Sequence, residues 1–239
     1  MKIKKILVKN ILSKSKVFDW TINPYIGCQH GCTYCYARFI KKFTGHKEKW
    51  GEFVDVKINA PQVLEREIKK KKKGNVWISG ICDPYQPIEE KYRLTRKCLE
   101  ILQKYQWPVT IQTKSPLVLR DLDLFKKFKE IEVGFTIPTA SENIRKIFEP
   151  RASSIQKRIR ALEKIHRENV KTFVMIAPVL PEAEALVEKL KNKANYVILD
   201  KMHYHYADWV YKKYNLKRDV NLKKLAYLFE KGGLPAKIC

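Results

Sequence analysis

The stretch NPYIGCQHGCTYCYAR, residues 23–38, places Cys28, Cys32 and Cys35 within eight residues of one turn-rich loop. Three thiolates spaced C-x3-C-x2-C can grip one soft metal centre, because short spacers let the loop wrap around it. Four cysteines complete the coordination of an iron–sulfur cubane, whereas three leave one iron open to a small chelating molecule. Gly27 and Gly31 allow the close backbone approach that such a loop needs. The spacing therefore favours an iron–sulfur centre with one open iron.

A single zinc ion is the alternative, with four ligand-type residues available in the same loop: Cys28, His30, Cys32 and Cys35. Structural zinc sites usually draw their ligands from two separated pairs. The remaining cysteines are scattered, at Cys82, Cys98 and Cys239. They supply no second pair, and they do not form the framework of a secreted disulfide-rich protein.

Downstream of the loop, short apolar runs alternate with helical patterns. The apolar runs predict strands at residues 76–82, 109–114, 132–138, 172–180 and 196–200. Helices are predicted at residues 60–73, 89–105, 119–130, 153–169, 181–194 and 220–233. This alternation is typical of right-handed βαβ units around a parallel sheet. With one more strand just before Cys28 there are six units, and 239 residues are short for the roughly 250 of a closed eight-unit barrel.

The expected fold is therefore α/β: a partial (β/α)6 barrel with a basic N-terminal extension and a C-terminal helix. We expect one domain over residues 1–239, with a core at about 20–202 and a helical extension at about 203–239. The basic start lacks a cleavage site, and no run of eighteen apolar residues exists. These features predict a cytoplasmic protein without a membrane partner.

The charge balance is unusual, because 49 Lys and Arg face 25 Asp and Glu, for a formal net charge of +24. Heat adaptation raises Glu together with Lys and does not explain an excess of one sign. Such an excess attracts polyanions, of which nucleic acid is the commonest.

Basic residues recur along the chain, and tyrosine and tryptophan interleave with the later ones at residues 204–214. Cations that pair with phosphates, together with rings that stack on bases, are typical of proteins that bind single strands or extruded bases. The predicted nucleic-acid-binding residues are Lys69, Lys70, Lys71, Lys72, Lys73, Lys212, Lys213, Lys217 and Arg218. The alternative is that residues 203–214 form a helix whose aromatics pack into the core.

The cysteine loop resembles that of the radical S-adenosylmethionine (SAM) superfamily. Further motifs follow in the order of the spore photoproduct lyase-related branch, from about residue 20 to residue 182: ISGICDPYQPIEEKYRLTR, TKSPLVLRDLDL, EPRASSIQKRIRALEKI and IAPVLP. The resemblance implies a 4Fe–4S cluster on Cys28, Cys32 and Cys35, whose open iron binds the amino and carboxylate groups of SAM. It also implies reductive cleavage of SAM to a 5′-deoxyadenosyl radical, and a low-potential electron donor such as ferredoxin or flavodoxin.

Polar residues at the carboxyl ends of the strands are the candidates for SAM binding, because ligands sit there in parallel α/β sheets. Asp83 could accept from the ammonium group of SAM, or it could cap a turn. Lys114 could pair with the SAM carboxylate, as a lysine at the corresponding place in the related lyase does, or it could be a surface lysine. Thr136 could meet the ribose or methionine end, or fill a strand as a β-branched residue.

Four further residues complete the predicted cofactor site. Glu149 and Arg158 could form an ion pair that orients the ribose side, although a structural salt bridge would look the same in sequence. Ala177 ends a strand, where a small side chain lets adenine approach. Tyr34 and Tyr36 flank Cys35; the first could pack against adenine and the second could face cofactor or substrate, or both could be plain core aromatics.

Cys82 precedes the DPYQP motif at a strand end. A thiol beside a carbon radical can donate hydrogen, so Cys82 is the candidate catalytic residue. A free cysteine at a strand end is also often a small buried hydrophobe.

The leading hypothesis is a radical SAM enzyme that acts on nucleic acid, in repair or base modification. One alternative keeps the chemistry but takes a peptide or small metabolite. The other is an iron–sulfur nucleic-acid-binding protein without turnover, against which the presence of Asp83 and Lys114 counts.

Overall fold

The computed structural model describes all 239 residues and divides the chain into two compact units. The first unit comprises residues 1–30, 37–113 and 117–132, and the second comprises residues 31–36, 114–116 and 133–239. None of the helices combines the length and apolar character needed to cross a bilayer. The organisation as one domain with a C-terminal extension stays a prediction.

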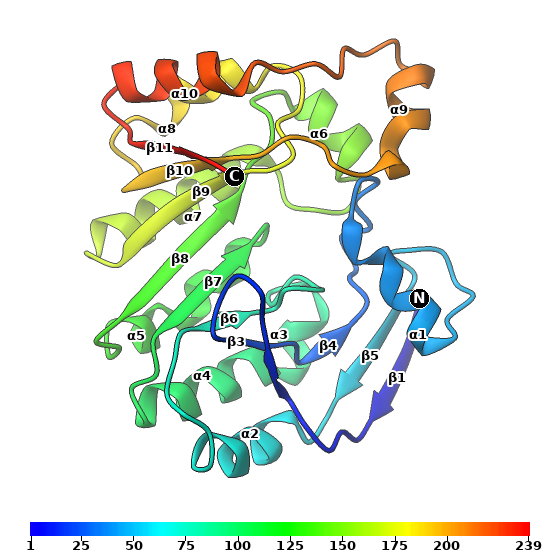
Figure 1. Cartoon of the computed structure of the whole chain (residues 1–239), viewed down its shortest axis with the longest axis vertical. Helices are drawn as coiled ribbons and strands as arrows, with labels where there is room; N and C mark the ends of the chain where they lie inside the picture. Colours follow the sequence, from blue (N-terminus) through cyan, green and yellow to red (C-terminus); the bar gives the residue numbers. More distant parts are fainter. The chain divides into compact units, whose positions relative to one another are not determined.

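The first unit is built on parallel strands β3 (Trp20–Ile22), β6 (Val76–Ile78) and β7 (Val109–Thr113), with β2 (Leu12–Lys14) antiparallel at the edge of β3 (Figure 1). Ile22, Ile78 and Ile111 are in register across these strands, and all three are fully buried. β3 is the strand predicted just before Cys28. Its carboxyl end therefore leads the chain into the cysteine loop.

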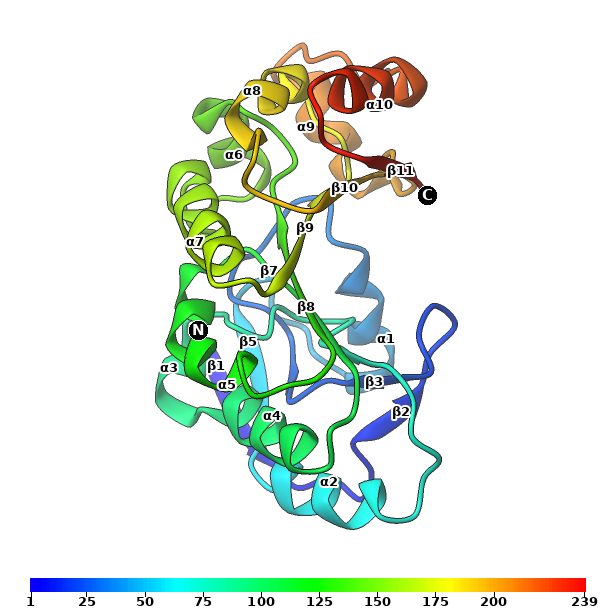
Figure 2. The same ribbon diagram turned by 90° about the vertical axis from the view of Figure 1, so that its left-hand side faces the viewer.

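Two helices of the first unit, α2 (Ala60–Ile68) and α4 (Leu94–Lys104), pack side by side (Figures 1 and 2). The single helix predicted over residues 89–105 is wrong, because the chain forms α3 (Ile88–Tyr92) and then α4. Arg93 separates them with a φ of 53°, a left-handed conformation that no helical periodicity reveals. Glu89, in the first turn of α3, is fully buried.

A second break falls at Asp121. The helix predicted over residues 119–130 is instead a 3-10 turn η2 (Pro116–Asp121) followed by the short α5 (Leu122–Phe125). Asp121 is fully buried. Its carboxylate accepts hydrogen bonds from other parts of the unit, which outweighs the local helical preference.

The basic N-terminus forms β1 (Lys2–Ile6), which pairs in parallel with β5 (Phe53–Lys57); β4 (Tyr25–Ile26) pairs with β5 on the other side. This three-stranded sheet was not predicted, because the exposed sequence of β1 lacks the alternation of a half-buried strand. Two further short helices follow the cysteine loop, η1 (Tyr36–Ile40) and α1 (Lys41–Thr44).

The second unit contains strands in the order β8, β9, β10, β11, whose bounds are Ile131–Thr136, Lys171–Ile176, Tyr196–Leu199 and Ala236–Ile238. β10 is parallel to both β9 and β11. The helix α7 (Ile155–Arg167) packs on β9, and α10 (Leu222–Lys231) packs beside β11 (Figure 2). β11 was not predicted, since it is only three residues long.

The remaining helices of this unit are α6 (Glu142–Phe148), η3 (Ala183–Ala185), α8 (Leu186–Leu190), η4 (His205–Ala207) and α9 (Asp208–Lys213). The helix predicted over residues 181–194 is shorter than expected, whereas the terminal helix ends at Gly232 as predicted. The six strands predicted as βα units are β3, β6, β7, β8, β9 and β10. The mostly parallel α/β class, with a partial rather than closed barrel, is confirmed.

Candidate cofactor site

The cysteine loop joins β4 to η1 and passes from the first unit to the second between His30 and Gly31. Cys28 and Cys32 are buried and Cys35 is half-buried, and all three are thiols outside any disulfide. Gly27 has a φ of +85°, and a Cβ at this position would lie 2.4 Å from the backbone oxygen of Phe53. Only glycine fits there, so the entry to the loop is fixed by the close approach of β5.

Two glutamine side chains hold the first part of the loop against the DPYQP segment. The amide of Gln86 donates from Nε2 to the Gly27 carbonyl at 3.2 Å and accepts at Oε1 from the Gln29 backbone N–H at 2.9 Å. Gln29 in turn accepts at Oε1 from the Ile88 backbone N–H at 2.5 Å. Gln86 is fully buried. Sequence analysis missed this pair, although the position of glutamine inside DPYQP was the available signal.

Replacement of Gln86 by alanine is therefore expected to loosen the loop. It removes two hydrogen bonds and leaves their buried partners unsatisfied, which should cost about 1–3 kcal/mol in the free energy of unfolding. The iron retained per chain after exposure to a chelator should fall as well. The measurements are urea unfolding and iron analysis after anaerobic reconstitution.

The matched control is Gln103→Ala, since Gln103 donates to the Lys127 carbonyl on a more exposed surface. Gln86→Glu keeps the acceptor for Gln29 and loses the donor to Gly27, so its loss of iron should be intermediate. Iron retention and unfolding of Gln86→Ala equal to those of Gln103→Ala would contradict the role of Gln86.

Asp83 lies at the start of the same segment and is buried. Its Oδ1 accepts from Thr113 Oγ1 at 2.6 Å and from the Tyr85 backbone N–H at 2.9 Å. The turn-capping role that sequence left open is thus present. The other oxygen, Oδ2, lies 3.2 Å from Nε2 of His30, a buried ring whose nitrogens have no hydrogen-bond partner of good geometry. A role of Asp83 toward the SAM ammonium stays a prediction.

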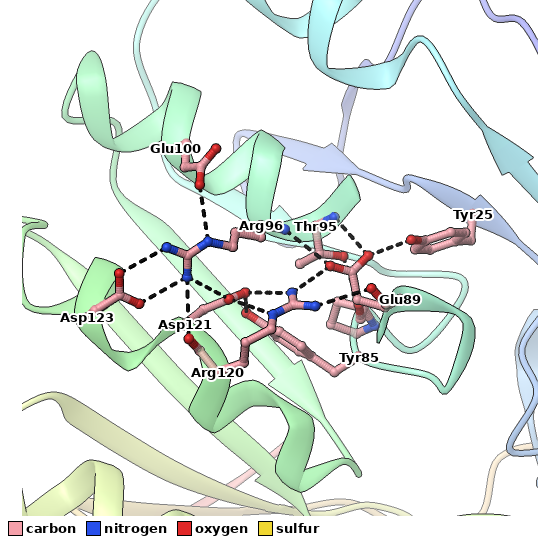
Figure 3. A network of polar contacts seen from close by, with 10 residues as sticks. Tyr25, Tyr85, Glu89, Thr95, Arg96, Glu100, Arg120, Asp121 and Asp123 are labelled. Carbon is pink, nitrogen blue, oxygen red and sulfur yellow. Dashed lines mark hydrogen bonds and ion pairs between the residues drawn. The ribbon is translucent and has the colours of Figure 1, made fainter. Parts of the chain in front are cut away.

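Next to the DPYQP segment, Glu89 is the centre of a network of polar and charged side chains (Figure 3). Glu89 accepts from the Tyr25 hydroxyl at 2.5 Å, from Arg120 Nη2 at 2.7 Å and from the Thr95 backbone N–H at 3.0 Å. Tyr25 belongs to β4, which leads into the cysteine loop. The network therefore fixes the strand from which the loop departs.

Asp121 forms the other half of the network (Figure 3). It accepts from the Tyr85 hydroxyl at 3.0 Å, from Arg96 Nη1 at 3.0 Å and from Arg120 Nε at 2.8 Å. Tyr85 is fully buried and sits inside DPYQP. Sequence analysis missed these residues, since Tyr85 and Arg96 are 36 and 25 residues away from Asp121 in the chain.

Cys82 is half-buried and packs against the apolar cluster of Tyr25, Val54, Val56, Ile88 and Leu94. Burial raises the pKa of the Cys82 thiol to about 12, although Ser79 acts in the opposite direction. The thiol therefore keeps its hydrogen at neutral pH, which both the catalytic and the structural interpretation require.

The second unit brings together four of the predicted residues around the fully buried Glu149. Arg158 Nη1 lies 2.6 Å from Glu149 Oε2, and Lys114 Nζ lies 3.7 Å from Oε1. The Tyr34 hydroxyl donates a short hydrogen bond to Glu149 Oε1. Arg158 also donates to the backbone oxygen of Thr136 at 2.9 Å. The predicted ion pair of Glu149 and Arg158 is present, and it anchors the end of β8.

The electrostatics of this group are set by two cations around one carboxylate. Burial acts to raise the pKa of Glu149, but the charges of Arg158 and Lys114 outweigh it and hold the pKa below its ordinary value. The three side chains together carry a net charge of +1. A net positive charge at a strand end suits an anionic group of a ligand, such as a carboxylate.

The remaining candidates differ in exposure. Thr136 is buried in β8, and Ala177 is half-buried and precedes Pro178 in a cis peptide bond. Tyr34 is buried, whereas Tyr36 is 38% exposed. Tyr34 is thus bound to Glu149 in the core, and Tyr36 faces outward from the same loop.

The basic residues lie on the surface of both units. Lys69 to Lys73 follow α2 in the first unit and are all exposed; Lys212, Lys213 and Lys217 are exposed in the second. Arg218 is half-buried and donates from Nη1 to Asp208 at 2.7 Å. Their contacts with nucleic acid stay predictions.

The aromatics of residues 204–214 are mostly exposed, so the interpretation of this segment as a core-packing helix is wrong. Only Tyr211 is buried, in a cluster with Phe148 and Cys32. The exposed members are Tyr204, Tyr206, Trp209 and Tyr214.

The radical SAM superfamily model matches residues 22–194, which is most of this chain. An uncharacterised protein of Methanocaldococcus jannaschii is 42% identical over 184 residues, covering 76% of this chain and 69% of that protein. An uncharacterised protein of Acidianus two-tailed virus is 33% identical over 171 residues, covering 68% of this chain and 56% of that protein. The radical SAM Nα-GlyT isomerase of Pseudomonas phage M6 is 23% identical over 160 residues, covering 66% of this chain and 32% of that protein.

Among solved structures, spore photoproduct lyase complexed with dinucleoside spore photoproduct has a TM-score of 0.71 at 16% identity, covering 99% of this chain and 81% of that one. Streptococcus suis SuiB bound to S-adenosylmethionine has a TM-score of 0.63 at 16% identity, covering 92% of this chain and 49% of SuiB. The fold and the motif-bearing loop define a cluster-dependent α/β enzyme. The chain belongs to the radical SAM superfamily, whose cofactors are a 4Fe–4S cluster and SAM.

The residues of the chain fit these cofactors. Three reduced thiols lie on one loop, and its first glycine is a position that any side chain would obstruct. Burial raises the pKa of Cys32 to about 12, with Lys114 acting in the opposite direction. No group of three or more His, Cys, Asp or Glu side chains converges on a single-ion site. Metal analysis of the purified protein decides between the cluster and the zinc alternative from sequence.

Proposed function

We propose that this radical SAM enzyme acts on nucleic acid, in repair or base modification. The observation that carries the proposal is the attachment of a basic, aromatic segment to the cysteine loop within the second unit. Val210 and Tyr211 of α9 share a core cluster with Cys32 and Tyr34. The same short helix exposes Lys212 and Lys213 to solvent. Lysines that can contact phosphates thus lie on a helix that packs against the cysteine loop.

The names of similar proteins support the same class of substrate. The solved structure with the TM-score of 0.71 is a lyase complexed with a dinucleoside photoproduct. SuiB has also been solved with its precursor peptide, at a TM-score of 0.58. The net charge of +24 favours a polyanion over a peptide for this chain.

In the proposed mechanism Cys28, Cys32 and Cys35 hold the cluster. A reduced cluster bound there would supply the electron for cleavage of SAM to methionine and a 5′-deoxyadenosyl radical. Lys114 binds the carboxylate of SAM, and Asp83 accepts from its ammonium group. A low-potential donor such as ferredoxin or flavodoxin reduces the cluster.

The other predicted residues shape the rest of the SAM pocket. Glu149 and Arg158 orient the ribose side and hold Thr136 at the end of β8. Ala177 leaves room for adenine. Tyr34, which is buried and hydrogen-bonded to Glu149, packs against adenine.

The charge of α9 is expected to set the salt dependence of nucleic-acid binding. Each phosphate contact on single-stranded nucleic acid contributes about 0.7 to the slope of log affinity against log salt concentration. The double variant Lys212→Glu/Lys213→Glu should therefore bind more weakly at low salt and lose roughly 1.4 from the slope. The measurement is fluorescence anisotropy with a labelled single-stranded oligonucleotide over a series of salt concentrations.

Lys223→Glu/Lys224→Glu is the matched control, because it makes the same change of net charge on exposed residues of α10. It should keep nearly the parental slope. If the two double variants weaken binding equally, the effect is one of net charge alone. If the parent protein does not bind nucleic acid at low salt, the proposed substrate class is wrong.

We further propose that Cys82 donates hydrogen to a substrate radical. Cys82→Ala should then form 5′-deoxyadenosine at a near-parental rate while the distribution of nucleic-acid products changes. Cys98→Ala is the control, since Cys98 is a fully buried thiol on α4 whose pKa is likewise raised by burial. The measurement is chromatography of both product classes. An unchanged distribution for Cys82→Ala would assign Cys82 to packing.

A further inference from the structure

Three tyrosine rings form a stack on the surface of the second unit. The ring centroids of Tyr36 and Tyr204 are 6.2 Å apart with planes inclined by 20°, and those of Tyr204 and Tyr206 are 5.8 Å apart at 13°. Tyr36, Tyr204 and Tyr206 are 38%, 48% and 37% exposed. We call them the tyrosine ladder. The exposed parts of these rings are aromatic surface that a folded protein normally buries.

The ladder is joined to the cysteine loop at both ends. Tyr36 directly follows Cys35 in the chain. Ala207, the residue after Tyr206, is fully buried in the cluster that contains Cys32 and Tyr34. The chain on one side and core packing on the other therefore keep the ladder beside the cluster ligands of this unit.

Polar contacts hold the backbone that presents Tyr204 and Tyr206. His203 Nε2 lies 2.7 Å from Asp200, and His205 Nδ1 lies 2.7 Å from Asp208. Arg218 donates to Asp208 at 2.7 Å. Three separate contacts thus fix the segment on both sides of the two rings. A platform that is already ordered loses little conformational entropy when a flat ligand stacks on it.

Basic residues flank the segment of Tyr204 and Tyr206 in the sequence. A cavity of about 150 Å³ adjoins the segment and is lined by Val179, Lys201, Met202, Arg218, Asp219 and Val220. Lys201 is exposed and precedes the ladder residues, and Lys212 and Lys213 follow on α9. Positive charge beside an aromatic platform is the pairing by which proteins hold single-stranded nucleic acid.

We propose that the tyrosine ladder stacks an unpaired nucleobase of a single-stranded or locally opened nucleic acid and holds it beside the cysteine loop. The inference rests on the proposed function and specifies its substrate. In a duplex each base is covered on both faces by its neighbours, so only an unpaired or extruded base offers a ring face to tyrosine. The lysines then meet the flanking phosphates.

Tyr204 is the residue to change, because its ring is stacked with both of the others and its loss breaks the ladder. Tyr204→Ala should weaken binding of a single-stranded oligodeoxynucleotide by roughly 5- to 150-fold, as expected if the broken ladder no longer stacks one base. The salt slope should stay parental, because no charge is removed. Tyr204→Phe keeps the ring and should bind within about twofold of the parent. Tyr227→Ala, which removes a 61% exposed tyrosine from α10, should bind like the parent.

The experiment is anisotropy with the single strand, the same sequence as a blunt hairpin duplex, and the matching oligoribonucleotide. Iron content and thermal unfolding of each variant are measured alongside. Duplex affinity should be lower than single-strand affinity and insensitive to Tyr204→Ala.

Tyr204→Ala could bind the single strand as tightly as the parent while the Lys212→Glu/Lys213→Glu variant still binds more weakly. This result would overturn base stacking on the ladder and leave the proposed function standing. An equal loss on the duplex and the single strand would overturn the preference for an unpaired base. Absence of binding by the parent to every oligonucleotide would overturn both.

Discussion

Replacing Arg158 by methionine is expected to destabilise the protein by about 3–5 kcal/mol, the usual effect of leaving a buried charge without its partner. Arg158 and Glu149 are both fully buried and lie 2.6 Å apart. Methionine fills similar volume but cannot compensate the carboxylate. The measurement is the free energy of unfolding by urea at neutral pH, on anaerobically prepared protein.

The double variant Glu149→Gln/Arg158→Met should recover a large part of the loss, because it removes the unpaired charge. Arg167→Met should be almost neutral, since the pair of Arg167 with Glu163 is exposed. A stability of Arg158→Met equal to that of Arg167→Met would contradict the assignment of the buried pair.

The pH dependence of the Arg158→Met deficit follows from Glu149. In the parent the pKa of Glu149 lies below its ordinary value of 4.5, because Arg158 and Lys114 outweigh burial. Its charge therefore contributes stability above the unfolded-state pKa, and this is lost as the pH falls through the folded-state pKa. Without Arg158, burial is opposed only by Lys114 and Tyr34, so the folded-state pKa of Glu149 rises relative to the parent. The deficit should be full at neutral pH and shrink as the carboxyl becomes protonated on acidification.

Replacing Cys32 by alanine is expected to reduce formation of 5′-deoxyadenosine to the uncatalysed background. Two cysteines cannot hold the cluster in the three-ligand form that leaves one iron open to SAM. The measurement is chromatography after reaction of reconstituted protein with SAM and dithionite, together with iron and sulfide analysis.

Cys98→Ala tests whether any buried thiol has the same effect, because Cys98 is fully buried on α4 outside the cysteine loop. It should retain iron and activity. Parental turnover by Cys32→Ala would contradict the assignment of the cluster ligands.

Local patterns predicted those parts of the fold that local interactions determine. The apolar runs around Ile78, Ile111 and Val174 predicted strands because they are buried in a parallel sheet. The spacing of the three cysteines predicted the ligand loop, since all of its information lies within eight residues. The family model and the similar solved structures confirm the family, the fold and the cofactors that these patterns predicted.

Contacts between distant residues were not predictable from local patterns. Gln29 and Gln86 are 57 residues apart, and Tyr25 and Glu89 are 64 apart. Periodicity cannot report such pairs, and it did not report the left-handed turn at Arg93 between α3 and α4. The exposure of Tyr204 and Tyr206 was likewise ambiguous, because the same aromatic spacing suits a core helix or a surface platform.

The proposed chemistry depends on a cluster held by three cysteines, with one iron that binds SAM. Its most direct test is metal and sulfide analysis of anaerobically purified protein, followed by electron paramagnetic resonance of the reduced protein with and without SAM. We expect about four irons and four sulfides per chain, as in a 4Fe–4S cluster, and a reduced-cluster signal that shifts when SAM is added. One zinc per chain with no iron or sulfide, or a cluster signal indifferent to SAM, would contradict it.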